Sequence, residues 1–193
     1  MIVALPVNRY RWHLAAASLA LLLVVPSLLK AADEKPPEAD NSISAVKRQT
    51  LKGFTYFYKS SETNIDGIRE TVEKLIPDLH KALAEGNVAV RGPLVFIYHG
   101  AVPDPKVKFT LEIGMMVAGG TKPVGDFKVR EVPEFHCASV LYTGPLMGLG
   151  AAFEKLYSDS SIKPTDESRE MYLYFEGLES PNNVIQVSAG TKE

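Results

Sequence analysis

The stretch VPEFHCASVLYTGPLMGLGAAFEKLY (residues 132–157), followed by REMYLYFEG (residues 169–177), decides the fold of this chain. It has the pattern of a strand, a Gly-Pro turn, a helix and a second strand. In the second strand, Glu170, Tyr172 and Tyr174 alternate with apolar residues. Because successive side chains of a strand point to opposite faces, this strand is predicted to have one apolar face and one acidic, aromatic face.

The same order of elements occurs in the first half of the chain. An aromatic strand and a helix precede LVFIYHG (residues 94–100), which matches MYLYFEG (residues 171–177) at an offset of 77 residues. A β-α-β-β unit used twice predicts an α+β fold. We expect two pseudo-symmetric β-α-β-β units that form an antiparallel sheet with two helices and a cleft between the halves.

Apolar periodicity places the individual elements. Apolar residues at spacings of three and four predict a helix over residues 65–85, and a second helix follows Pro145. Strands are predicted over residues 54–59, 94–99, 107–117, 126–131, 135–142, 168–175 and 184–187.

The N-terminal segment has the layout of a secretory signal. Arg9 and Arg11 precede an almost wholly apolar run, Leu14–Leu29, and the small residues Ala31 and Ala32 follow soon after it. The run has 16 residues, whereas a helix needs about 20 to cross a bilayer comfortably. The position that should be small for cleavage holds Leu29 or Lys30, so an uncleaved anchor stays open beside a cleaved signal.

These features divide the chain into three parts. Residues 1–32 are predicted to be a signal peptide or N-terminal anchor, residues 33–49 a disordered linker, and residues 50–190 the folded domain. The protein is therefore expected to be exported, to the periplasm or the extracellular space. Contact with a membrane is expected only through an uncleaved segment at residues 14–29, and the sequence predicts no oligomeric state.

Charge and composition argue against several kinds of partner. Removing residues 1–32 deletes three basic and no acidic residues, so the net charge moves from −2 to −5. An acidic domain does not favour nucleic acid. The single cysteine, Cys137, is expected to be a buried thiol, and the four histidines lack metal-ligand spacing. No metal or other cofactor is expected.

Five segments together resemble the GyrI-like small-molecule-binding domain, the effector-binding domain of AraC-type and MerR-type regulators. They are GPLVFIYHG (92–100), FTLEIGMMV (109–117), VPEFHCASVLYTGP (132–145), the helix with AAFEKLY (151–157) and REMYLYFEG (169–177).

The resemblance covers residues 52–189. It implies binding of lipophilic, often cationic compounds in an aromatic cleft that holds an acid on a late strand, where Glu170 stands. Leu146 occupies a position where the family often has Tyr. Only the tether and the apolar run precede Thr50, so a DNA-binding helix-turn-helix is not expected.

The candidate ligand-binding residues are Glu170, Tyr172, Tyr142, Tyr56 and Tyr58. A carboxylate among aromatic rings suits a cation, because both attract positive charge. The alternative for Glu170 is a solvated carboxylate paired with Arg169 or a lysine.

Two further residues are assigned structural places. Tyr98 corresponds by the repeat to Phe175 on the apolar face, so it is expected in the core. Glu112, among apolar neighbours, is expected to be an exposed strand partner rather than a second acid of the cleft.

Two other functions are compatible with the sequence. Some members of the wider family are thought to hydrolyse reactive ligands, which would make Glu170 a general acid or base with Tyr142 or Tyr172 as its partner. The SOUL-type haem proteins share the doubled layout, and His99 or His136 would then have to be the axial ligand.

Overall fold

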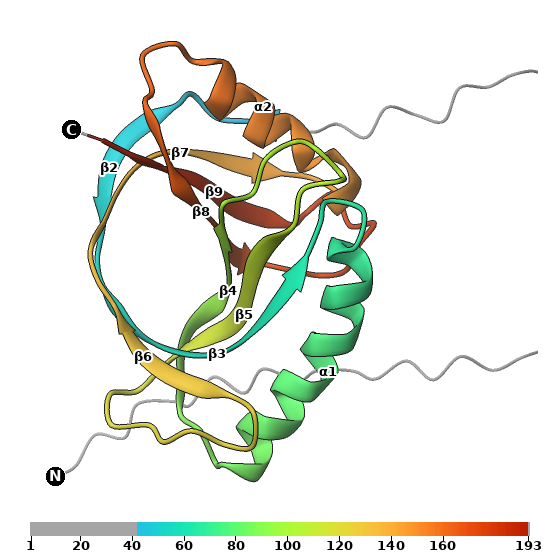
Figure 1. Cartoon of the computed structure of the whole chain (residues 1–193), viewed down its shortest axis with the longest axis vertical. Coiled ribbons are helices and arrows are strands. Elements are labelled where there is room, and N and C mark those ends of the chain that lie inside the picture. Colours follow the sequence, from blue (N-terminus) through green and yellow to red (C-terminus); the bar gives the residue numbers. More distant parts are fainter. Residues whose placement is uncertain (1–41, 193) are drawn as a thin grey trace, which may run out of the picture. The chain divides into compact units, whose positions relative to one another are not determined.

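The computed structural model describes residues 42–192, and the predicted export segment lies outside this range (Figure 1). The strands are β1 (Ser42–Ile43), β2 (Lys47–Leu51), β3 (Phe54–Thr63), β4 (Val90–His99), β5 (Phe109–Val117), β6 (Lys128–Val132), β7 (Phe135–Thr143), β8 (Pro164–Tyr174) and β9 (Val184–Thr191). The helices are α1 (Ile68–Glu85), a 3-10 turn at Leu146–Gly148 and α2 (Gly150–Ser158). Between residues 42 and 192, every helix is too short or too polar to span a bilayer.

The sheet has the predicted α+β arrangement with internal symmetry. Within the described residues the sheet has nine strands, of which eight follow the order β1-β7-β9-β8-β4-β5-β3-β6, and the ninth, β2, pairs with β7. The first unit contributes β3, α1, β4 and β5, and the second contributes β7, α2, β8 and β9. Strands β4 and β8 pair antiparallel at the centre, so each unit repeats the other outward from this pair. The doubled β-α-β-β fold is therefore confirmed.

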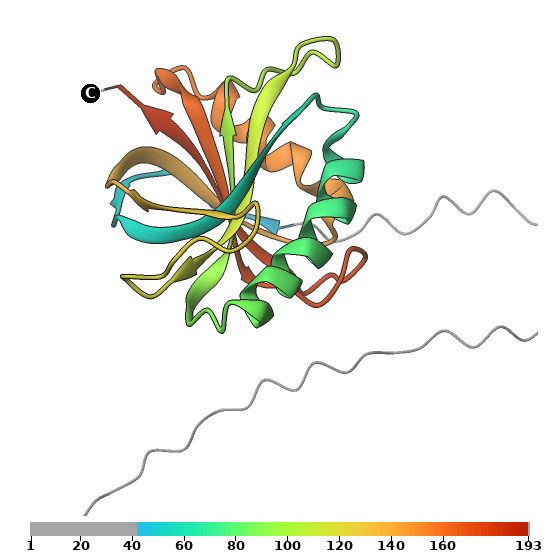
Figure 2. The same ribbon diagram turned by 60° about the horizontal axis from the view of Figure 1, so that its bottom comes forward.

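The two faces of the sheet are packed differently. Both helices bury their apolar sides against one face, which we call the helix face, where Leu79 of α1 and Leu156 of α2 join the main core. On the opposite face, the outer strands curl toward one another and enclose a smaller core that contains Tyr56 and Ile97. Figures 1 and 2 show this curl, with β2, β3 and β6 sweeping around the side away from the helices.

The predicted disordered linker is wrong for its last residues. β1 and β2 pair antiparallel with β7, with Ser42 opposite Thr143 and Gln49 opposite Cys137. The sequence KRQTL of β2 has no apolar alternation, and four of its five side chains are exposed. Backbone hydrogen bonds hold such an edge strand, and they leave no mark in the sequence pattern. The remainder of the predicted linker, residues 33–41, lies outside the described residues.

Helix and strand bounds shift where local hydrogen bonds intervene. α1 begins at Ile68 because Asn64 first closes a turn, in which its carbonyl oxygen and its Oδ1 both accept from the N–H of Gly67. β8 begins four residues earlier than predicted, and β9 continues four residues further, to Thr191. Neither difference changes the order of the elements.

Candidate functional site

Glu170 lies at the centre of the helix face, on β8 next to β4. Its register partners are Phe96 on β4 and Val187 on β9. The residue is 4% exposed. The cleft expected between the halves is therefore filled with side chains in this structure, and the acid lies beneath them.

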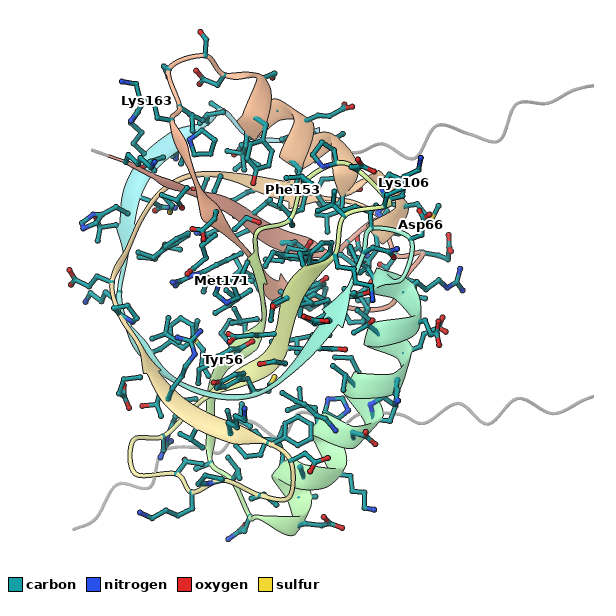
Figure 3. All side chains as sticks on the ribbon, in the orientation of Figure 1. Tyr56, Asp66, Lys106, Phe153, Lys163 and Met171 are labelled. Atoms are coloured by element: carbon teal, nitrogen blue, oxygen red, sulfur yellow. The ribbon has the colours of Figure 1, made fainter. Side chains whose placement is uncertain are left out.

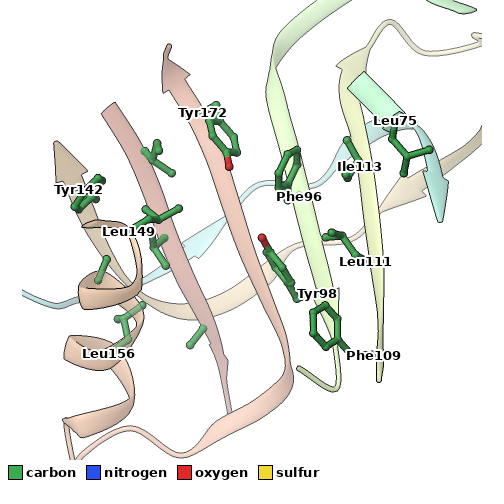
Figure 4. Close-up of a cluster of buried hydrophobic side chains, with 14 of the residues drawn as sticks. Leu75, Phe96, Tyr98, Phe109, Leu111, Ile113, Tyr142, Leu149, Leu156 and Tyr172 are labelled. Carbon is green, nitrogen blue, oxygen red and sulfur yellow. The ribbon is translucent and has the colours of Figure 1, made fainter. Parts of the chain in front are cut away.

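Two phenols hold the carboxylate of Glu170. The hydroxyl of Tyr98 donates to Oε1 at 2.9 Å, and the hydroxyl of Tyr172 donates to Oε2 at 2.6 Å. Figure 4 shows both hydroxyls pointing into the space between β4 and β8. Burial and the nearby carboxylate raise the pKa of both phenols well above 10, so both remain protonated donors.

In the part of the chain that the structure describes, no cationic side chain compensates the charge of Glu170. Burial raises its pKa from 4.5 to about 6, although the hydrogen bonds from the two phenols lower it. Within residues 42–192, no lysine, arginine or histidine forms an ion pair with Glu170. A carboxylate held in this way is negatively charged at neutral pH, and a cation placed beside it would stabilise that charge.

Aromatic rings surround the acid and its two phenols. The ring of Tyr172 meets Phe96 at 4.9 Å and Phe175 at 5.9 Å between centroids. The ring of Tyr98 meets Phe153 of α2 at 6.1 Å. We call Glu170 and these five rings the acid cage.

The structure brings together only part of the predicted site. Tyr172 contacts Glu170 directly. Tyr142 is fully buried in the same core, but its hydroxyl donates to the carbonyl of Pro145 at 2.5 Å, where it holds the turn before α2. Tyr56 and Tyr58 belong to the smaller core on the opposite face of the sheet, so they do not line the acid cage. Figure 3 shows Tyr56 inside the curl of the outer strands.

Tyr98 is a site residue that the sequence pattern assigned only to the core. It is 5% exposed, as expected, and its hydroxyl also binds the acid. Its register partner on β8 is Ser168, two residues before Glu170, so both side chains point to the helix face. Pairing the two repeat units through their equivalent strands would have placed Tyr98 beside the acid.

Arg169, the alternative partner of Glu170, points to the opposite face. Its Nε and Nη2 both donate to Oε1 of Glu167 at 2.6 Å, and its guanidinium lies 3.8 Å from the ring centroid of Phe135. Burial lowers the pKa of Arg169. Adjacent residues of a strand cannot share a face, so this arginine cannot neutralise Glu170.

The opposite face carries a second group of ionisable side chains, in which acids and bases alternate. Nη2 of Arg130 binds Oε2 of Glu112 at 2.7 Å. His99 lies between two carboxylates, with Nε2 3.6 Å from Glu112 and Nδ1 3.9 Å from Glu167. Glu167 in turn binds Arg169. Glu112 is 8% exposed, so the expectation of an exposed strand partner is wrong.

His99 makes the stability of this group depend on pH. Its polar contact with the carboxylate of Glu112 raises its pKa above 6.5, although burial opposes this. The charges of Glu112 and Glu167 add to the rise, and the charge of Arg130 lowers the pKa. A raised histidine pKa stabilises the fold below about pH 6.5, and this contribution is lost as the pH rises through the folded pKa. In chemical unfolding, His99→Gln should lower stability most below pH 6.5 and least in alkaline buffer. A constant difference between the two proteins across this range would contradict the assignment.

The phenol donors make a second prediction. Tyr172→Phe removes one donor that stabilises the carboxylate, so the pKa of Glu170 should rise above about 6. Carbon NMR of the Glu170 carboxyl measures this directly. Tyr174→Phe is the matched control, because the hydroxyl of Tyr174 donates to Glu176 at the surface. If both variants leave the titration unchanged, the hydrogen bonds do not tune the acid.

A surface groove lies elsewhere on the domain. It encloses about 340 Å³ between β3 and α1, and its lining includes Lys59, Glu62, Glu70 and Lys74. Its charges are mixed and its other lining groups are mainly hydroxyls, so it lacks the uncompensated charge of the acid cage.

Comparison with known proteins agrees with this fold. Among curated proteins, a sequence search finds no match to this chain. Among solved structures, the EcmrR–DNA complex contains a chain that superposes with a TM-score of 0.65 at 17% identity, over 79% of this chain and 58% of that chain. The crystal structure of the EcmrR C-terminal domain gives a TM-score of 0.63 at 16% identity, over 80% of this chain and 98% of that domain.

A third solved structure is SAV2435 bound to tetraphenylphosphonium, with a TM-score of 0.54 at 13% identity over 77% of this chain and 94% of that chain. This chain therefore spans about 58% of the length of the matching chain in the EcmrR–DNA complex and 98% of the chain in the C-terminal domain structure. At these identities the structural likeness concerns the fold.

The family model described as the GyrI-like small molecule binding domain matches residues 45–185, and the chain belongs to this family.

Proposed function

We propose that the domain binds a lipophilic organic cation at Glu170, as an exported sensor, scavenger or accessory domain. The observation that carries this proposal is the buried carboxylate of Glu170, which has phenol donors and aromatic neighbours but no cationic partner among residues 42–192. An organic cation supplies the missing charge. Its apolar groups can replace the side-chain contacts that fill the acid cage.

The energetic gain comes from charge and from aromatic contact. A cation about 4 Å from the carboxylate gains on the order of 4 kcal/mol at an effective dielectric constant near 20. Each aromatic ring that faces the cation adds roughly 0.5–2 kcal/mol, depending on desolvation. Small inorganic cations are strongly hydrated and carry no apolar groups to pack against the rings, so the cage favours large organic cations.

Ligand entry requires side chains to move. Phe153 is half-buried on α2, and Phe175 is 37% exposed in the loop after β8. Each touches one of the two phenols that bind Glu170. Rotation of these two rings would open the cage without breaking the sheet.

A pair of ions of similar shape tests the proposal. Tetraphenylphosphonium, the ion in the SAV2435 structure, should raise the melting temperature of this protein in a dose-dependent way. Tetraphenylborate has the same four phenyl groups and a negative charge, so it should give no such shift at the same concentrations. Equal shifts with both ions would show that apolar contact alone drives binding, and the proposal would fail.

A further inference from the structure

Four large apolar or aromatic side chains lie uncovered at one end of the sheet, and we call them the apolar rim: Met147, Tyr174, Phe175 and Leu178. Met147 is 85% exposed, and the other three are 37–51% exposed. The N–H of Leu146 donates to the carbonyl of Leu178 at 2.9 Å, which places Met147 beside the loop after β8. Exposed apolar side chains that gather in this way are typical of a surface that meets a partner or a membrane.

The described chain begins at the same end. Ser42 on β1 is opposite Thr143, Thr143 is opposite Val184, and Val184 is opposite Tyr174. This row crosses four neighbouring strands and ends in the rim. The segment that precedes Ser42 therefore joins the domain beside the rim.

The sequence upstream of Ser42 limits the distance to a membrane. The apolar run Leu14–Leu29 is separated from Ser42 by residues 30–41. An extended chain of this length spans at most about 40 Å. If the run is retained in a bilayer, the lipid surface lies within reach of the rim.

We propose that the apolar rim rests on the surface of the lipid bilayer in which residues 14–29 are inserted. Tyrosine and other aromatic side chains favour the boundary between lipid and water, where the ring is in an apolar setting and the hydroxyl remains wet. Glu176 and Glu179 lie in the same loop as Phe175 and Leu178. Their negative charge favours neutral phospholipid headgroups over anionic ones.

This placement gives the acid cage an entrance from the membrane. Phe175 belongs both to the rim and to the cage, because its ring meets Tyr172, which binds Glu170. A lipophilic cation concentrates at the bilayer surface and would reach Glu170 past this ring. The entrance rests on the proposed function, whereas contact between the rim and lipid does not.

Single labelled cysteines in the full chain test this contact. Cys137 is 1% exposed, so a thiol dye will label an introduced surface cysteine selectively. Met147→Cys and Leu178→Cys each carry a polarity-sensitive dye, and the chain is reconstituted in phosphatidylcholine vesicles that contain brominated lipid. The control is Val102→Cys, at a residue that is 42% exposed. Val102 lies close to Gly100, whose N–H donates to the carbonyl of Asp166 at the opposite end of β8.

We expect a blue shift and bromine quenching at positions 147 and 178, and neither at position 102. The proposal is overturned if the two rim positions behave like position 102. It is also overturned if the blue shift appears without vesicles and grows with protein concentration, because a second copy of the chain would then cover the rim.

A separate measurement distinguishes this proposal from the proposed function. Tetraphenylphosphonium binding is measured on the same full chain in detergent, where the bilayer is absent. Quenching without cation binding would support the contact between rim and lipid and contradict the proposed function. Cation binding without quenching would support the proposed function and contradict the lipid contact.

Discussion

Glu170→Gln should reduce the affinity for tetraphenylphosphonium by about 10²–10³-fold at neutral pH. The charge interaction lost is on the order of 4 kcal/mol at 4 Å, and each 1.4 kcal/mol corresponds to about tenfold in the dissociation constant. Desolvation of the ion and the remaining aromatic contacts set the lower end of this range. Isothermal titration calorimetry on the two proteins measures the difference.

A matched variant separates the local charge from the net charge. Glu154→Gln removes one negative charge from the exposed side of α2 and leaves the acid cage intact. Its affinity should stay within about twofold of the unchanged protein, because solvent and salt screen an exposed charge. Comparable losses in both variants would mean that general electrostatic attraction drives binding.

Glu170→Gln should also stabilise the free protein at neutral pH, by up to about 2 kcal/mol. An ordinary carboxyl titrates near pH 4.5, and Glu170 in the folded protein titrates at about 6. Because the pKa of this carboxyl is raised in the folded protein, its protonated form contributes to the free energy of unfolding. This contribution is fully present below about pH 4.5 and is lost as the pH rises through 6. At about 1.36 kcal/mol per pKa unit, the loss amounts to about 2 kcal/mol.

Glutamine has nearly the shape of the protonated acid, with an NH₂ donor group and a carbonyl acceptor, but cannot ionise. The difference in unfolding free energy between Glu170→Gln and the unchanged protein should therefore be small at pH 4.5 and grow to its full value by pH 7.5. Urea unfolding at a series of pH values gives this curve, and His99 contributes equally to both proteins. A flat difference, or a destabilised variant at pH 7.5, would mean that burial does not penalise the charge of Glu170.

Much of the fold could be predicted because its pattern is local and occurs twice. Alternation placed Glu170 and Tyr172 on one face of β8, and the repeat gave the order of elements in both halves. Edge pairing was harder to predict. β2 is held by backbone hydrogen bonds to β7 and has exposed polar side chains, so nothing in its composition distinguishes it from a linker.

The candidate site was harder to predict because it depends on register between strands. The row Phe57, Met115, Leu94 and Tyr172 crosses β3, β5, β4 and β8. It places Phe57 on the helix face and turns its neighbours, including Tyr56, to the opposite face. Alternation states which residues of one strand share a face, but not which face of the neighbouring strand they join.

The pKa of Glu170, measured with and without a bound cation, tests the central claim most directly. Carbon NMR of the labelled carboxyl should give a midpoint of about 6 in the free protein. Saturation with tetraphenylphosphonium should lower that midpoint below 4.5, because a cation beside the carboxylate favours the charged form. A midpoint that the ligand leaves unchanged would contradict the claim that Glu170 is the cation-binding acid of this domain.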